Sequence, residues 1–261
     1  ISPILDATRS VTNLTMSSGS FSLGGFTLTS TGVSLFTSGT VANGTMSTTG
    51  TTTFSGTSFS ASATVTVNSA SVAGMIGTTF NGPLSITRTG GGTDFWTGGN
   101  TFNGTTSIIM IGSGQIRFAT GAADVFNGDV TFTMSGSGIL FASFQSPYVT
   151  SYNGNIILNC TSTGAIIFGQ NNGSSSLATG KTLSIGGSGF ASSSTLQLTN
   201  FTQLGGTSQS LTLTGTATLT LNSGCTFNGD VVFSAPNLNL NGSTYWGASS
   251  FTNSLGGGNN V

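Results

Sequence analysis

Charge is what this sequence has least of. Charged residues make up 3% of its 261 residues, against about 25% in an ordinary soluble domain. There is no histidine, and the net charge is −1. Nucleic-acid binding requires clustered basic side chains, whereas the four basic residues here are scattered: Arg9, Arg88, Arg117 and Lys181. We therefore expect no nucleic-acid partner.

The same scarcity argues against an enzyme. Without histidine there is no Ser-His-Asp or Cys-His arrangement and no zinc site of the usual types. Glycosidases need paired carboxylates, and the chain offers only Asp6, Asp94, Asp124, Asp129 and Asp230. The loop Gly90-Gly91-Gly92-Thr93-Asp94 loosely resembles a calcium nonapeptide, but it is not repeated. We predict no catalytic residue, no cofactor and no metal site.

Long apolar runs and clustered cysteines are also missing. No run of about 18 apolar residues could span a bilayer, so we expect no membrane span. Cys160 and Cys225 are far apart and lack the spacing of metal ligands. With this spacing the two cysteines can be either two buried free thiols or the partners of one disulfide.

What the chain has instead is a repeated phrase, an aromatic residue followed by Asn-Gly. Its aromatic residue stands at positions 80, 102, 126 and 152, and then at 227, after a step about three times as long. A period of this size is typical of a solenoid, a propeller or an array. Phe54-Ser55-Gly56 is read as a worn copy. The five copies are predicted repeat turns: Phe80-Asn81-Gly82, Phe102-Asn103-Gly104, Phe126-Asn127-Gly128, Tyr152-Asn153-Gly154 and Phe227-Asn228-Gly229. Asn and Gly both tolerate positive φ, which we expect these corners to need.

Side chains alternate after each turn. The second and fourth residues after the glycine are mostly apolar and the residues between them are small or polar, which predicts a strand with one buried side. A second strand is expected about ten residues further on, with Ile116/Phe118, Ile139/Phe141 and Ile166/Phe168 facing inward. The predicted core ladder is Leu84, Ile86, Ile108, Val130, Phe132, Ile156, Leu158, Val231 and Phe233.

Two or three short strands in about 24 residues fit one coil of a β-solenoid, whereas a propeller blade needs about 40 residues or more. We predict an all-β parallel β-helix with coils of about 22–26 residues, running as a single continuous solenoid over 1–261. A longer repeat of about 165 residues aligns Thr79-Phe80 with Thr244-Tyr245, and Phe36 with Phe201. Neither end shows a polar cap, so we expect a repeat unit or fragment of a longer assembly.

Other residues are candidates for acid–base chemistry, glycan binding or ice binding. Asp129 and Asp230 both directly follow a turn glycine, which favours a turn role over acid–base chemistry. Trp96 and Trp246 lie in glycine-rich loops and are the candidates for exposed glycan-stacking platforms, whereas Tyr152 stands where the repeat places a core Phe. An ice-binding threonine ladder needs one continuous column. The residues five after each turn glycine break it: Thr87, Ile109, Thr133, Asn159 and Ser234.

The stretches NTFNGTTSI and DVFNGDVTF resemble the long Asn/Gly/Thr-rich repeat regions of secreted surface proteins in Bacteroidota-type bacteria. The resemblance covers about Thr78 to Gly257. It implies an extracellular or cell-surface location, and it carries over no functional residue. We predict a structural subunit of an extracellular fibre whose partner is another copy of itself. The alternative is a rod segment of a giant adhesin that contacts glycans or a cell surface; an ice-binding protein ranks below both.

Overall fold

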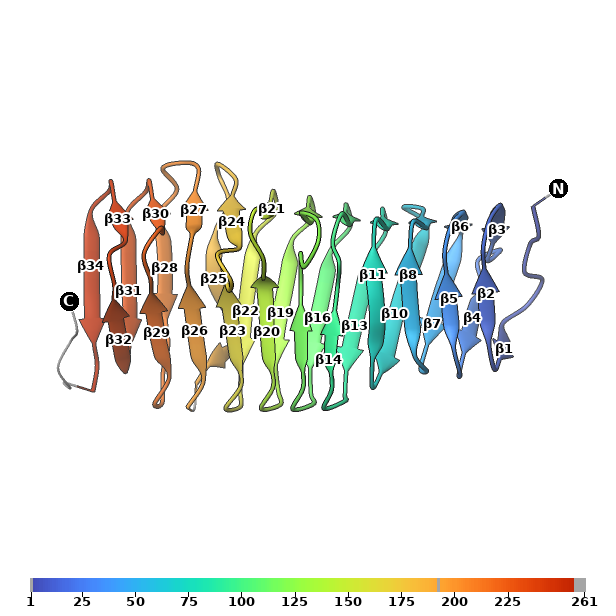
Figure 1. The fold of residues 1–261 in the computed structure, drawn as a ribbon, viewed down its shortest axis with the longest axis horizontal. Coiled ribbons are helices and arrows are strands. Elements are labelled where there is room, and N and C mark those ends of the chain that lie inside the picture. Colours follow the sequence, from blue (N-terminus) through green and yellow to red (C-terminus); the bar gives the residue numbers. More distant parts are fainter. Residues whose placement is uncertain (1, 192, 256–261) are drawn as a thin grey trace.

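The computed structural model describes residues 2–191 and 193–255. Within them the chain forms 34 β-strands that pair in parallel, and the predicted all-β solenoid is confirmed. Figure 1 shows the strands following one another along the long axis, with the two chain ends at opposite ends of the molecule. Each coil contributes one strand to each of three faces, giving eleven complete coils before the last strand. The predicted span of 1–261 includes residues 1, 192 and 256–261, which lie outside the described part.

Face 1 carries the alternating strands predicted after each turn. It consists of a nine-stranded sheet followed by a three-stranded sheet. The nine strands are β1 (Arg9–Val11), β4 (Thr27–Ser30), β7 (Gly44–Thr48), β10 (Ala63–Ser69), β13 (Leu84–Arg88), β16 (Thr106–Met110), β19 (Val130–Met134), β22 (Ile156–Cys160) and β25 (Leu183–Phe190). The three are β28 (Gln209–Thr212), β31 (Val231–Ala235) and β34 (Ser249–Asn253).

Face 2 also consists of two sheets, of four and seven strands. The first holds β2 (Leu14–Met16), β5 (Ser34–Phe36), β8 (Thr52–Ser55) and β11 (Val72–Ile76). The second holds β14 (Thr93–Phe95), β17 (Gln115–Arg117), β20 (Ile139–Ser143), β23 (Ala165–Phe168), β26 (Thr195–Leu198), β29 (Thr218–Leu221) and β32 (Asn237–Leu240).

Face 3 is one unbroken sheet of eleven short strands, and it carries the aromatic residues of the repeated phrase. Its strands are β3 (Ser20–Ser22), β6 (Thr40–Ala42), β9 (Ser58–Phe59), β12 (Thr79–Phe80), β15 (Thr101–Phe102), β18 (Val125–Phe126), β21 (Val149–Tyr152), β24 (Ser174–Leu177), β27 (Phe201–Gln203), β30 (Thr226–Phe227) and β33 (Thr244–Tyr245).

Coil length changes along the axis. On face 1 the first four steps between paired residues are 18 or 19 residues long. The steps lengthen to 26 residues from Val130 to Ile156 and 27 from Ile156 to Leu183. The step from Val231 to Ser249 is again 18 residues. The predicted coil length therefore describes the middle of the solenoid, not its ends.

The short early coils explain two departures from the predicted repeats. Phe54 lies in β8 on face 2, so it is not a copy of the turn phrase; Phe59 on face 3 pairs with Phe80 in that role. The predicted long repeat does place Thr79 and Thr244 in one column of face 3. It does not relate Phe36 to Phe201, which lie on faces 2 and 3.

The core runs the length of the solenoid between the three faces, and aromatic rings stack along it. Phe59, Phe80, Phe102, Phe126 and Tyr152 form a column with centroid separations of 5.1, 5.6, 4.4 and 5.1 Å. Their planes lie within 11° of parallel. Because each coil repeats the same inward position about 4.8 Å above the last, one buried ring per coil produces a continuous stack.

Candidate functional site

The asparagines of the repeated phrase form a ladder on the outside of the solenoid. The side-chain amide of Asn103 donates to the Oδ1 of Asn81 at 2.6 Å, and Asn127 donates to Asn103 at 2.6 Å. Asn153 continues the ladder to Asn127 at 2.8 Å. In the fifth copy Asn228 donates instead to the backbone carbonyl of Gln203, at 2.7 Å. These turns therefore tie successive coils together.

The glycines of the phrase are needed for close approach rather than for positive φ. None of the five Asn-Gly pairs has a positive φ, so the expected reason for them is wrong. A Cβ at Gly104, Gly128 or Gly154 would lie 2.3 Å from the carbonyl oxygen of the turn glycine in the preceding coil. Only hydrogen fits there, so the glycine column sets the distance between coils.

All nine residues of the predicted core ladder lie in the strands of face 1, and at most 2% of each is exposed. The second predicted strand is displaced in one coil. Leu140 pairs with Ile116 and Ile166 in the core, whereas Phe141, only 7% exposed, pairs with Arg117 on the outer side of the sheet. The expectation that Ile139 and Phe141 face inward is therefore wrong by one residue.

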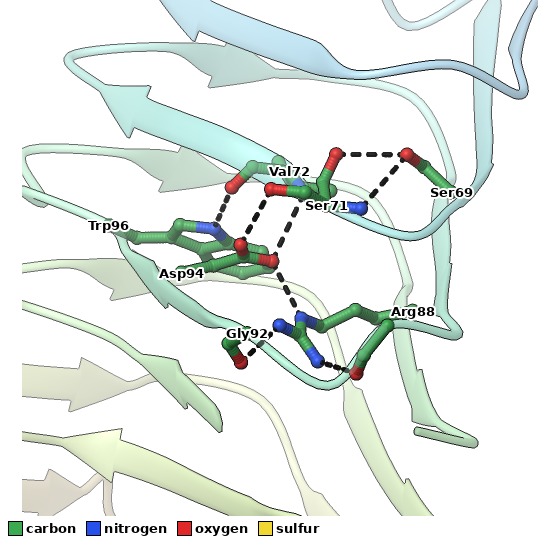
Figure 2. Close-up of polar contacts among 8 residues, drawn as sticks. Ser69, Ser71, Val72, Arg88, Gly92, Asp94 and Trp96 are labelled. Atoms are coloured by element: carbon green, nitrogen blue, oxygen red, sulfur yellow. Dashed lines mark hydrogen bonds and ion pairs between the residues drawn. The ribbon is translucent and has the colours of Figure 1, made fainter. Parts of the chain in front are cut away.

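A buried ion pair between Arg88, at the end of β13 on face 1, and Asp94, in β14 on face 2, lies where the two sheets of face 2 meet (Figure 2). The Nε of Arg88 donates to Asp94 Oδ2 at 2.7 Å, and the two side chains are 0% and 3% exposed. Arg88 also donates to the carbonyls of Gly90 and Gly92, so the Gly-rich loop closes around its guanidinium.

Asp94 and Trp96 replace backbone hydrogen bonds between β11 and β14. Asp94 accepts from the backbone N–H of Val72 at 3.0 Å and from the hydroxyl of Ser71 at 2.7 Å. The indole N–H of Trp96 donates to the carbonyl of Val72 at 3.1 Å (Figure 2). Trp96 is 0% exposed, which contradicts its expected role as a glycan platform. Trp246 is 74% exposed.

Gln209 makes the corresponding junction on face 1. Its Oε1 accepts from the backbone N–H of Leu183 at 2.7 Å, and its Nε2 donates to the carbonyl of Lys181 at 3.1 Å. Neither junction was predicted. The sequence signal for the junction on face 2 was the pair Arg88 and Asp94, two opposite charges six residues apart with three glycines between them. This pattern fits a corner that folds back on itself.

Asp124 is a buried carboxylate that forms no ion pair with any described residue. It accepts from the backbone N–H and the side-chain amide of Asn100 at 3.0 and 2.8 Å, and from the N–H of Ala119 at 3.1 Å. Burial raises the pKa of Asp124 to about 7, against the opposing effect of these hydrogen bonds. Every one of its contacts supports a corner between coils.

The remaining candidates for chemistry also have local structural contacts. Asp129 accepts from the N–H of Asn155, and Asp230 from that of Ala248, both at 2.8 Å in the next coil. Cys160 and Cys225 are free and buried, and burial raises the pKa of both thiols. The described residues contain no group of three Asp, Glu, Cys or His side chains placed to hold a metal.

The ends of the described solenoid are open. β1 and β2 are edge strands at one end, and β32, β33 and β34 at the other. At the first end, the residues before β1 partly cover face 3, because Ile4 bridges Ser22 in parallel. A hollow of about 640 Å³ opens beside them, and core side chains line it: Leu14, Met16, Phe21 and Phe36.

Comparisons of the chain with protein-family models, with curated proteins and with solved structures found no match. Residues 2–191 and 193–255 contain no helix with the length and apolar character needed to cross a bilayer.

Proposed function

We propose that the chain is a structural rod segment of an extracellular fibre, in which further β-coils cover both open ends. The observation that carries the proposal is the pair of open ends, with edge strands on every face at the C-terminal end. Edge strands expose unpaired N–H and C=O groups that readily pair with another strand. The hollow at the N-terminal end also leaves core side chains without a covering coil.

The polarity of the strands selects the partner. All sheets are parallel, so the edge at one end presents the hydrogen-bonding pattern that the edge at the other end completes. A head-to-tail contact between copies does not close, and it therefore extends into a filament. The partner we propose is another copy of the same solenoid, or a further stretch of the same chain.

The surface suits a long stack of coils. Like charges placed directly opposite each other in a sheet repel, and a chain with 3% charged residues avoids this in every column. The asparagine ladder adds hydrogen bonds along the axis instead. These features support a structural role, and we assign the chain no reaction.

Electron microscopy of the native material, together with its intact mass, tests the proposal. Faces 2 and 3 have eleven strands each and face 1 has twelve, so at about 4.8 Å per strand one copy would extend a filament by about 53–58 Å. Filaments with this repeat and a chain mass of 26.0 kDa would show copies joined end to end. Filaments made of a much heavier chain would favour the rod of a giant adhesin. Short rods that never join would overturn the fibre proposal.

A pair of variants tests the junction itself. Leu14 lines the N-terminal hollow, so Leu14→Lys places a charge where the next coil would pack. Val33 is 58% exposed, and Val33→Lys is the matched control. We expect Leu14→Lys to stop filament growth with its circular dichroism spectrum unchanged, and Val33→Lys to assemble normally. Equal assembly of both folded variants would exclude the hollow as the junction.

A further inference from the structure

An arginine surrounded by aromatic rings lies on the outer side of face 2. Arg117 pairs in register with Phe95 in one neighbouring strand and with Phe141 in the other. Its guanidinium carbon lies 4.8 Å from the ring centre of Phe95, 5.6 Å from that of Phe141 and 4.7 Å from that of Phe144. The planar cation is thus held over three rings, one from β14 and two from the end of β20 and the residue that follows it.

The lengthening of the middle coils builds this cluster. β20 shifts register after Phe141, and the chain then enters the loop that carries Phe144 toward face 3. The rings of Phe141 and Phe144 meet edge to face at 5.3 Å. The short coils near the N-terminus leave only two or three residues between the strands of faces 2 and 3, so they have no room for such a loop.

Arg117 has no acidic partner. In the described part of the chain Arg9 pairs with Asp6 and Arg88 with Asp94, and no carboxylate pairs with Arg117. Its Nε and Nη2 both donate to Oε1 of Gln115, at 3.0 and 2.7 Å. These two hydrogen bonds hold the guanidinium in place and keep the side-chain amide of Gln115 next to it. Within residues 2–191 and 193–255, Nη1 of Arg117 and Nε2 of Gln115 donate to no protein acceptor.

We propose that Phe95, Arg117 and Gln115 form a binding site for a carboxylate-bearing sugar, such as a uronic acid residue of a polysaccharide. A guanidinium is suited to binding a planar carboxylate through paired hydrogen bonds. Phe95 is 51% exposed, so a sugar ring can stack its C–H face on its side chain. The free amide N–H groups of Gln115 suit a sugar hydroxyl.

A sugar fits this surface better than an acidic peptide. Extended peptides commonly bind by adding a strand to an open sheet edge. Here β17 is hydrogen-bonded to β14 on one side and to β20 on the other, so it offers no edge. The exposed ring next to a fixed cation is instead a platform for a flat ligand.

Calorimetric titration with a trisaccharide of galacturonic acid, and with its methyl ester, tests the site. The two ligands differ only in the carboxylates. We expect the acid to bind and the ester to bind at least about tenfold more weakly, because a charge-assisted hydrogen bond is lost. Arg117→Gln should weaken binding of the acid by about tenfold or more, and Phe95→Ala by about twofold to tenfold.

Matched controls separate this site from general attraction. Arg9 is an exposed arginine on another face, and Trp246 is an exposed aromatic residue without a cation over its ring. Arg9→Gln and Trp246→Ala should leave the affinity unchanged. Equal losses in these controls, or no heat with the acid, would overturn the site. A short acidic peptide that binds as tightly as the trisaccharide, and is indifferent to Phe95→Ala, would overturn the sugar assignment. None of these outcomes depends on whether the rods form filaments.

Discussion

Replacing one turn glycine by alanine tests whether close approach sets the coil spacing. A Cβ at Gly104 would lie 2.3 Å from the carbonyl oxygen of Gly82 and 2.4 Å from its carbonyl carbon. The two coils would have to separate locally by about 1 Å to restore ordinary contact. The hydrogen bond from Asn103 N to Phe80 O, 2.8 Å long, would then be lost. Overpacking strain of about 1–3 kcal/mol and a lost bond of about 1 kcal/mol give a destabilisation of about 2–4 kcal/mol.

Urea unfolding followed by circular dichroism measures this loss, and amide hydrogen exchange at Asn103 localises it. The control is Gly187→Ala, because a Cβ at Gly187 would meet no atom within 4 Å and its φ is not positive. That variant should be neutral, or more stable by about 0.4–1 kcal/mol through the lower entropy of its unfolded chain. Equal stability of Gly104→Ala and Gly187→Ala would refute the explanation of the glycine column.

Three further predictions concern buried groups. Phe132→Asp should prevent folding, because it buries a charge without a partner, whereas Thr131→Asp on the outer side should fold. Circular dichroism distinguishes the two variants, and a folded Phe132→Asp variant would contradict the stacked-coil fold. Arg88→Met should cost about 3–5 kcal/mol in urea unfolding by leaving Asp94 charged and buried, and adding Asp94→Asn should restore part of it; no recovery would exclude the ion pair as the cause. The pKa of Asp124 is raised from 3.8 to about 7, so the folded state favours the protonated form and stability should fall as pH rises from about 4 to about 7. Asp124→Asn should flatten this dependence in urea midpoints, and an unchanged slope would show that another group titrates.

The solenoid was predictable because its face 1 strands are long enough to show alternation. Five residues such as Val130 to Met134 display two or three inward side chains, and the turn phrase marks where they begin. The strands of face 3 are not visible in this way. β15 contains only Thr101 and Phe102, so a third strand per coil has no period of its own. The stacking of coils was therefore accessible from the sequence, and the three-faced cross-section was not.

The polar interior was missed for a different reason. Charged residues and residues in glycine-rich loops are usually exposed, and that prior placed Trp96 on the surface. In the structure the long corner between β13 and β14 folds inward around Arg88, and Asp94 and Trp96 turn toward β11. Sequence spacing could suggest the ion pair, but only the fold shows that it joins two sheets. The cluster at Arg117 was hidden similarly, since Phe144 reaches it through a loop.

Because the coils are shorter at the two ends than in the middle, the solenoid has narrow ends and a wide central part. Steps of 18 or 19 residues near one end and 18 at the other give the two ends nearly the same perimeter. Two such rods laid side by side would touch at their widest parts, near the coil of 27 residues. Joined end to end, they would bring end coils of nearly equal perimeter together. The resulting filament would widen and narrow once in every copy. We expect this periodic variation in width to be visible by electron microscopy without any label on the protein.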